Sequence, residues 1–374
     1  MNYEFVLLFT ANKSSLVIFV MEQNRFLLYG ANGYTGQLIA KYSRQYDLQP
    51  ILAGRKEDQL KVLSNQLDMP YRVVDLNDSA KLRAVVHEVK VVLHAAGPFQ
   101  FTAKQMVEAC LQSGTHYIDI NGDISVFESL KQYNEAAKQA GITILPGAGF
   151  DVVPTDCTAL LLKNLLADAV SLKLAFATIG GGLSHGTATT MVDKLGKGGN
   201  IRRNGKIIKV PLGQHGFWAD FGEKKLFVMS IPWGDISTAY HTTGIPNIET
   251  FAGISTVAFR ILKLQFLFNW ILRTSAVRNF LKRKIDSRAA GPSDDMRSKA
   301  KSLIWGQAIN EEGKTATARM VTPDGYTLTA HSSLIIAQKI VKENFVTGYQ
   351  TPASAYGPDL VLEIPGVKRE IVDS

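Results

Sequence analysis

Short apolar runs alternate with helical stretches through the first 150 residues, and this alternation limits the folds open to the chain. Continuous apolar strands separated by helices predict a parallel sheet that is covered on both faces. We therefore expect an α/β fold whose first domain is a Rossmann-type, doubly wound parallel sheet. The predicted strands are 26–29, 50–53, 71–74, 89–94, 117–120 and 142–145. The predicted helices are 34–46, 57–67, 80–87, 102–113 and 125–140.

The texture of the sequence changes after residue 150. Glycine-dense turns and short strand-like pieces predict a second, α+β domain over 151–345 with a mainly antiparallel sheet. Residues 1–24 contain two apolar clusters, but charged residues keep both too short for a membrane span, and neither a basic start nor a cleavage site indicates a secretory signal. We expect an N-terminal extension there. A start-site artefact, with Met21 as the natural start, is the alternative.

The composition is that of an ordinary globular chain, with 46% apolar and 20% charged residues. Cys110 and Cys157 cannot form a disulfide framework, and two thiols suit a reducing compartment. We expect a cytoplasmic protein and no metal site, because the sequence lacks a cluster with metal-ligand spacing. It also lacks an H-E-x-x-H motif, which argues against a metalloprotease of that type.

The strongest chemical signal is a G-x-x-G-x-x-G loop between the first strand and the first helix. Gly30 permits a tight turn, Gly33 lets the backbone approach a pyrophosphate, and Gly36 lets the helix pack closely on the sheet. Phosphates would then lie at the helix N-terminus, where the free N–H groups and the dipole favour negative charge. A structural turn without a ligand is the alternative. The predicted cofactor-binding residues of the loop are Gly30, Ala31, Asn32, Gly33, Tyr34, Thr35 and Gly36.

Other cofactor contacts are predicted at the carboxyl ends of the next strands. Arg55 and Lys56 follow the second strand, where NAD-binding domains carry an acidic residue; a guanidinium there favours NADP(H) over NAD(H). A solvated Arg-Lys pair is the alternative. Asp75 is placed to approach the adenine, although a turn aspartate would explain it equally well. After the fourth strand, small residues and a ring could border the nicotinamide: Ala96, Gly97, Pro98 and Phe99.

Several ordered blocks together resemble the saccharopine dehydrogenase-like oxidoreductases, especially trans-acting enoyl reductases and lipid-associated saccharopine dehydrogenase-like proteins. The blocks are GANGYTG (30–36), LAGR (52–55), AAGPF (95–99), GTHYIDINGD (114–123), LPGAGFDVVPTD (145–156), GPSDDMR (291–297) and GYQTPASAYG (348–357). The resemblance implies an NADP-binding domain over 25–150, NADP(H)-dependent redox chemistry and a C-terminal helix over 346–374 that packs back on the first domain. Asp123 departs from the glutamate that is usual in the family.

Candidate catalytic residues lie at the end of a predicted strand and in a glycine-rich loop. Asp119 and Tyr117 lie at the end of a predicted strand, where doubly wound sheets bind ligands. A structural, helix-capping aspartate is the alternative. His185 lies in a glycine-rich loop and would suit acid–base chemistry, although many loop histidines are inert. We take these three as candidate catalytic residues. We expect an apolar enoyl or carbonyl substrate, because no convincing pair of arginines stands out that would bind two amino-acid carboxylates. An amino-acid substrate is the alternative.

The net charge of +8 arises within one segment. Residues 260–301 hold 11 basic and 3 acidic residues, whereas 1–150 hold 14 of each. In 251–288, a stretch rich in apolar residues precedes a cluster of cations, which predicts a helical segment that lies on an anionic membrane surface. Packing at a homodimer interface or over the substrate pocket is the alternative. No nucleic-acid partner is expected, because the segment carries no reading motif. A further alternative for the whole protein is a non-catalytic lipid-surface protein that retains the nucleotide-binding fold.

Overall fold

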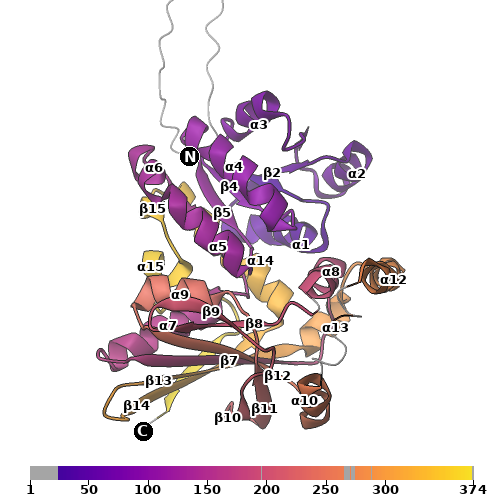
Figure 1. Ribbon diagram of the computed structural model, residues 1–374. Coiled ribbons are helices and arrows are strands. Elements are labelled where there is room, and N and C mark those ends of the chain that lie inside the picture. Colours follow the sequence, from indigo (N-terminus) through magenta and orange to yellow (C-terminus); the bar gives the residue numbers. More distant parts are fainter. Residues whose placement is uncertain (1–23, 195, 265–269, 271–273, 288, 373–374) are drawn as a thin grey trace, which may run out of the picture.

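Two sheets organise the chain, one above the other in Figure 1. The computed structural model describes residues 24–372 except 195, 265–269, 271–273 and 288. The predicted N-terminal extension therefore lies outside the described residues, apart from Asn24. Both the parallel first sheet and the mainly antiparallel second sheet agree with the predicted fold class.

The first sheet has seven parallel strands in the order β15-β6-β5-β4-β1-β2-β3. Its first six strands coincide with the six predicted apolar runs to within a few residues. They are β1 (Arg25–Tyr29), β2 (Gln49–Gly54), β3 (Tyr71–Val73), β4 (Val91–His94), β5 (His116–Asp119) and β6 (Thr143–Leu145), with β15 (Gly348–Tyr349) at the edge.

Side chains alternate across this sheet, so each face has its own core and its own helices. Phe26 and Leu28 pack with α1 (Tyr34–Tyr42), α2 (Glu57–Leu67) and α14 (Gly325–Val341), and the short helix η1 (Ser43–Tyr46) continues α1. Leu27 and Tyr29 pack on the opposite face. The helices there are α3 (Ser79–Val86), α4 (Phe99–Ser113), α5 (Ile124–Leu130), η2 (Lys131–Tyr133) and α6 (Asn134–Gln139).

The second sheet follows the order β10-β11-β12-β7-β13-β14-β16, and a β8/β9 hairpin pairs with β12. Only the β12/β7 pair is parallel among these described pairings. The strands are β7 (Ser171–Ile179), β8 (Gly199–Arg203), β9 (Lys206–Val210), β10 (Gly216–Asp220), β11 (Lys225–Ser230), β12 (Asn247–Gly253), β13 (Lys301–Ile309), β14 (Thr315–Pro323) and β16 (Lys368–Val372).

Helices cover the second sheet unequally. Its face toward the first domain packs against α7 (Val153–Leu165) and α9 (Asp235–Thr243). The opposite face holds an aromatic core that includes Phe217, Phe251 and Trp305. Four more helices lie along the right-hand side of Figure 1: α8 (His185–Lys194), α10 (Thr256–Lys263), α12 (Ser275–Asp286) and α13 (Asp294–Lys299).

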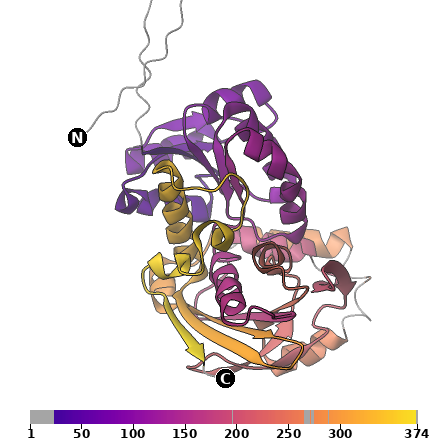
Figure 2. The same ribbon diagram turned by 90° about the vertical axis from the view of Figure 1, so that its left-hand side faces the viewer.

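The C-terminal part differs from the helix predicted over 346–374. It contains β15, α15 (Pro352–Tyr356), η4 (Leu360–Glu363) and β16, so it joins both sheets (Figure 2). Gly348, Gly357 and Gly366 have positive φ, and three prolines follow residue 350, which together prevent a continuous helix. The helix that does pack back on the first sheet is α14, inside the range predicted for the second domain.

The basic apolar segment 251–288 also differs from the single helical segment that was predicted. Its first three residues, from Phe251 to Gly253, complete strand β12, because they pair with β11 and the Phe251 side chain belongs to the sheet core. Helix α10 begins only after the capping Ser255, whose hydroxyl accepts the N–H of Ala258. Helix α12 follows, and the residues 265–269 and 271–273 between them lie outside the described part.

Candidate nucleotide-binding site

The glycine loop lies where three strands end. Gly30 adopts φ +90°, and its N–H donates to the Ala53 carbonyl oxygen at 2.8 Å. A Cβ at Gly30 would lie 2.7 Å from the Ala96 nitrogen, and one at Gly36 would lie 2.3 Å from the Gly30 oxygen. Both distances are too short for any side chain. The two outer glycines therefore bring the turn, the end of β4 and helix α1 into direct contact, as the spacing predicted.

The middle of the loop is open toward solvent. Gly33 is exposed at the N-cap of α1, and no side chain caps this helix. The first N–H groups of the helix consequently lack the partners that a capping side chain would supply. Asn32 is turned aside, since its amide donates to Gln59 at 2.8 Å. A pyrophosphate fits this arrangement, because it would accept from these N–H groups and approach Gly33 without meeting a Cβ.

Charged groups lie at the adenosine side of the loop. Arg55 and Lys56 are exposed directly after β2. Burial raises the pKa of Tyr29 to about 12, with a further rise from Asp75 and an opposing effect from Arg55. The charges of Asp75 and Arg55 therefore both act close to the Tyr29 hydroxyl. This hydroxyl donates to the Val74 carbonyl oxygen. Asp75 itself is held in a turn, where one carboxylate oxygen accepts two hydrogen bonds from Asn77.

The loop after β4 borders the same site. Ala96 lies next to Gly30, and its carbonyl oxygen accepts the Thr102 hydroxyl at 2.8 Å. Gly97 and Pro98 are exposed, and the Phe99 ring packs edge-on against His94. The structure therefore brings the predicted residues of this loop beside the glycine loop, with their exposed side available to a ligand.

Tyr117 and Asp119 are buried and hydrogen-bonded to one another, with 2.7 Å between the hydroxyl and a carboxylate oxygen. The other carboxylate oxygen accepts the N–H groups of Asn121 and Gly147, so Asp119 links the ends of β5 and β6. Burial raises the pKa of Asp119 to about 6, against the opposing effect of these hydrogen bonds. These hydrogen bonds give Asp119 a structural role, because they join the ends of two neighbouring strands.

His185 lies apart from that pair. It begins α8 in the second domain, is exposed, and its ring nitrogen lies 2.6 Å from Asp286 on α12. The structure thus does not bring the three candidate catalytic residues together. The buried histidine nearer to Tyr117 is His94, which the sequence analysis did not select; its Nδ1 lies 3.2 Å from the Tyr117 hydroxyl. Burial lowers the pKa of His94 to about 3, so the ring is neutral.

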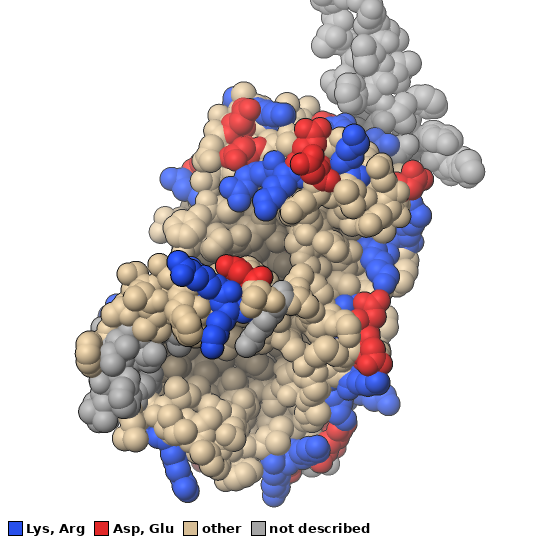
Figure 3. Space-filling model, turned by 90° about the vertical axis from the view of Figure 1, so that its right-hand side faces the viewer, with Lys and Arg blue, Asp and Glu red and all other residues tan. Residues whose placement is uncertain are grey.

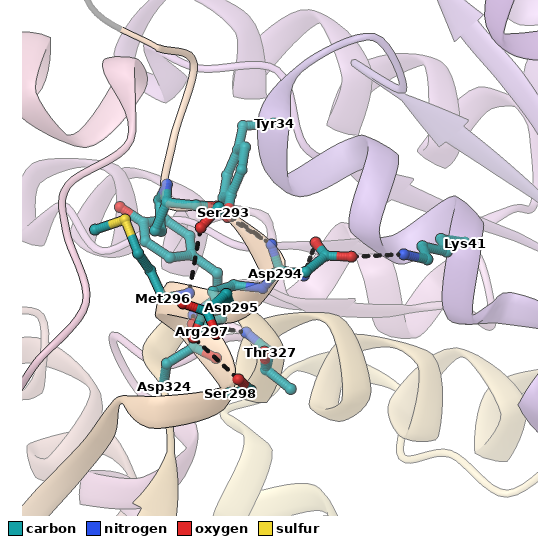
Figure 4. Close-up of polar contacts among 12 residues, drawn as sticks. Tyr34, Lys41, Ser293, Asp294, Asp295, Met296, Arg297, Ser298, Asp324 and Thr327 are labelled. Atoms are coloured by element: carbon teal, nitrogen blue, oxygen red, sulfur yellow. Dashed lines mark hydrogen bonds and ion pairs between the residues drawn. The ribbon is translucent and has the colours of Figure 1, made fainter.

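Residues from the second domain cover the start of α1 (Figure 4). The Tyr34 hydroxyl donates to the Pro292 carbonyl oxygen and accepts a hydrogen bond from Arg297 at 2.8 Å. The Tyr326 ring packs edge-on against Tyr34. The block GPSDDMR (291–297) carries part of the family resemblance. Neither its spacing nor its composition indicates a contact with the glycine loop, more than 250 residues away.

Aromatic and acidic side chains meet at the junction of the two domains. The ring of Trp233 lies 4.5 Å from that of Phe176, which in turn packs edge-on against Phe150. Next to Trp233, Asp235 is fully buried, and burial raises its pKa well above the ordinary value for an aspartate. The loop after β5 reaches this group, since a Cβ at Gly122 would lie 2.1 Å from an Asp151 carboxylate oxygen. Figure 3 shows the molecular surface hollowed between the two halves.

Comparison with known proteins finds a family likeness in the first domain. Residues 26–145 match the family model of the saccharopine dehydrogenase NADP binding domain. The cofactor class predicted from the glycine loop is therefore confirmed, as is the predicted resemblance.

Relatives and a solved structure extend the likeness. The chain is 28% identical over 209 residues to a saccharopine dehydrogenase-like oxidoreductase of Mus musculus, covering 49% of each chain. It is 31% identical over 138 residues to a trans-acting enoyl reductase of Mycobacterium ulcerans, covering 35% of this chain and 33% of that one. The matches thus span about half or less of these relatives. Saccharopine dehydrogenase (L-Glu forming) from Saccharomyces cerevisiae shares the fold, with 13% identity, 94% and 100% coverage and a TM-score of 0.67.

Among the described residues, no group of three or more His, Cys, Asp or Glu side chains is arranged to hold a metal ion. No helix in the same part of the chain is long and apolar enough to span a bilayer.

Proposed function

We propose that the protein is an NADPH-dependent reductase of an apolar enoyl or carbonyl substrate, such as an acyl chain. The observation that carries this proposal is the intact glycine loop, with an exposed Gly33 at an uncapped helix N-terminus and a cation pair after β2. Bound NADPH would supply a hydride, which together with one proton reduces a C=C or C=O bond and leaves NADP⁺.

The aromatic group at the domain junction supports an apolar substrate. Phe150, Phe176 and Trp233 lie beyond the carboxyl ends of the parallel strands, where doubly wound sheets bind their ligands. Their rings offer apolar contact area to an acyl chain. The relative from Mycobacterium ulcerans carries the name of an enoyl reductase, in agreement with this substrate class.

An amino-acid substrate of the saccharopine type is the alternative, and the buried arginines argue against it. Among the described residues, Arg202 and Arg297 are buried. Arg202 donates to the carbonyl oxygens of Ile236 and Gly205 and to Glu128. Arg297 is likewise held by groups of the protein. Neither has its guanidinium fork free for a substrate carboxylate, which a dicarboxylic amino-acid substrate would require.

The cofactor is tested by titrating NADPH and NADH into the protein and following fluorescence. We expect NADPH to bind more tightly. Replacing Arg55 with alanine should weaken NADPH by about 1–3 kcal/mol, the usual value of a charge-assisted contact, and leave NADH nearly unchanged. Lys61→Ala, an exposed cation on α2, is the matched control and should change neither. Equal affinities for the two nucleotides in the unmodified protein contradict the role given to Arg55.

The substrate class is tested by NADPH consumption with acyl thioesters that carry a C=C or a keto group. We expect oxidation of NADPH that increases with acyl-chain length, because longer chains bury more apolar surface. Turnover of glutamate with an aldehyde, and none of the thioesters, would favour the amino-acid alternative. Tight NADPH binding without turnover of either class would favour the non-catalytic alternative.

A peripheral position on a membrane facing the cytoplasm is a second proposal, and it rests on helix α10. Val257 and Ile261 are each 65% exposed, no residue of this helix is buried, and Arg260 and Lys263 lie in its last turn. A groove of about 430 Å³ lies beside its capping Ser255, and apolar side chains of β7 and β11 together with Ile254 line much of it. Exposed apolar side chains next to cations suit an anionic lipid surface.

Vesicle flotation tests this position. The protein should float with vesicles of phosphatidylcholine and phosphatidylglycerol at low salt and less with phosphatidylcholine alone, because anionic lipid pairs with the cations. Val257→Asp with Ile261→Asp should abolish flotation. Val62→Asp, at a similarly exposed valine on α2, is the control and should float. Equal flotation of all variants excludes α10 as the contact.

A further inference from the structure

Arg297 joins the second domain to the cofactor loop of the first. It lies on α13 with its side chain buried, and one terminal nitrogen donates to the Tyr34 hydroxyl at 2.8 Å. The other donates to Asp294 at 2.8 Å. Figure 4 shows these contacts beside the end of α1 that follows the glycine loop. The hydrogen bonds to Tyr34 and Asp294 raise the pKa of Arg297 against the effect of burial, so the guanidinium is charged.

The Tyr34 side chain is enclosed by groups of the second domain. Its hydroxyl donates to the Pro292 carbonyl oxygen at 2.5 Å, and a Cβ at Gly291 would lie 2.6 Å from its ring. Tyr326 closes another side, with 5.1 Å between ring centroids, and the Tyr326 hydroxyl accepts the N–H of Ser184. The ring therefore cannot leave this site unless segment 291–297 moves with it.

A second contact connects the same segment to the far end of α1. Asp294 forms an ion pair with Lys41 at 3.0 Å, in addition to its bond with Arg297. Both Lys41 and Asp294 are largely exposed, so this pair contributes little by itself. The contact of the buried Arg297 with Tyr34 is partly buried and charge-assisted, and removing one partner of such a contact is costly.

The contact between Arg297 and Tyr34 matters for cofactor binding because Tyr34 belongs to the glycine loop. Tyr34 directly follows Gly33, and its own N–H belongs to the first turn of α1, where a pyrophosphate would accept hydrogen bonds. We propose that Arg297 is a positioning residue for cofactor binding: by holding Tyr34 it sets the glycine loop, although it does not touch the cofactor itself. The proposal rests on NADPH binding at the loop.

Two probes separate the loop from the adenosine side. NADPH contacts both, whereas adenosine 2′-monophosphate lacks both phosphates of the pyrophosphate and the nicotinamide, so it reports on the Arg55 side. Arg297→Met should weaken NADPH binding by about tenfold or more and change the affinity for adenosine 2′-monophosphate by less than about twofold. Arg297→Lys, which keeps the charge but not the two-pronged geometry, should recover part of the NADPH affinity. Tyr34→Phe removes the same hydrogen bond and keeps the ring, so it should weaken NADPH selectively too.

Arg319→Met is the matched control. Arg319 also forms a two-pronged contact, with Asp220 on the second sheet away from the loop. Equal loss of NADPH affinity in the Arg297 and Arg319 variants, equal loss of both probes, or unchanged NADPH affinity in Arg297→Met and Tyr34→Phe overturns the proposal. An unmodified protein that does not bind NADPH refutes the proposed function, and the present proposal with it, before any variant is made.

Discussion

The glycine loop offers a sharp test, because the structure assigns different roles to two of its glycines. A Cβ at Gly36 would lie 2.3 Å from the Gly30 carbonyl oxygen and 2.9 Å from the Ala31 Cα. Both are backbone atoms, so no side-chain movement relieves the overlap. We expect Gly36→Ala to lower the free energy of unfolding by about 1–3 kcal/mol, the usual cost of overpacking.

Gly33→Ala should have the opposite profile. At this position the nearest atom to a Cβ is the Gly30 oxygen at 3.3 Å, and φ is −71°, which alanine adopts without strain. The loss in stability should therefore stay below about 1 kcal/mol. The added methyl group would occupy the space that the pyrophosphate requires, so NADPH affinity should fall about tenfold or more, equal to about 1.4 kcal/mol.

Urea unfolding and NADPH titration of the two variants decide between packing and ligand binding at each glycine. Arg55→Ala, which removes a cofactor contact without changing the loop, serves as the reference for a pure binding effect. If Gly33→Ala binds NADPH as tightly as the unmodified protein, the phosphates do not lie at this helix N-terminus. If Gly36→Ala unfolds at the same urea concentration as the unmodified protein, the close packing of α1 on the turn is wrong.

Three further predictions concern residues outside the loop. Arg202→Met should lower the free energy of unfolding by about 1–3 kcal/mol in urea, because it leaves the carbonyl oxygens of Ile236 and Gly205 without their donor. The pKa of Asp119 is raised to about 6 in the fold, so stability should fall as pH rises from about 4 to about 6, where the carboxyl ionises first in the unfolded chain. Asp119→Asn should reduce this slope in urea unfolding at several pH values; an unchanged slope assigns it to other groups. His185→Ala removes only an exposed pair with Asp286, and kcat should change less than about twofold; a large loss would restore His185 as a catalytic residue.

Local chemistry explains why so much of the first domain could be predicted. Strand 26–29 is apolar on both faces, and the glycines after it permit one kind of turn, so strand, loop and helix are specified within eighteen residues. Asp123 illustrates the same point: its carboxylate caps α5 by accepting the N–H of Ser125, as an aspartate before a helix predicts.

The failures have a common physical origin. Periodicity assigns a helix but not its partner, so it did not reveal that α14 covers the first sheet or that the C-terminal residues add a strand to each sheet. It also did not distinguish a buried strand from a helix at 251–253. Apolar runs of that length fit either structure, and the choice depends on which neighbour completes the core.

By itself, the sequence determined the parallel sheet, the glycine loop and the cofactor class, because these depend on residues that are close together in the chain. Only the tertiary structure decided that Tyr117 and Asp119 are buried beneath the site, that His185 lies apart from them, and that Arg297 reaches Tyr34 from 263 residues away. The burial of Tyr117 and Asp119 depends on the helices and loops that cover the first sheet, and the other two facts depend on how two separately built sheets pack together. Long-range packing positions these side chains, and no local sequence pattern predicts it.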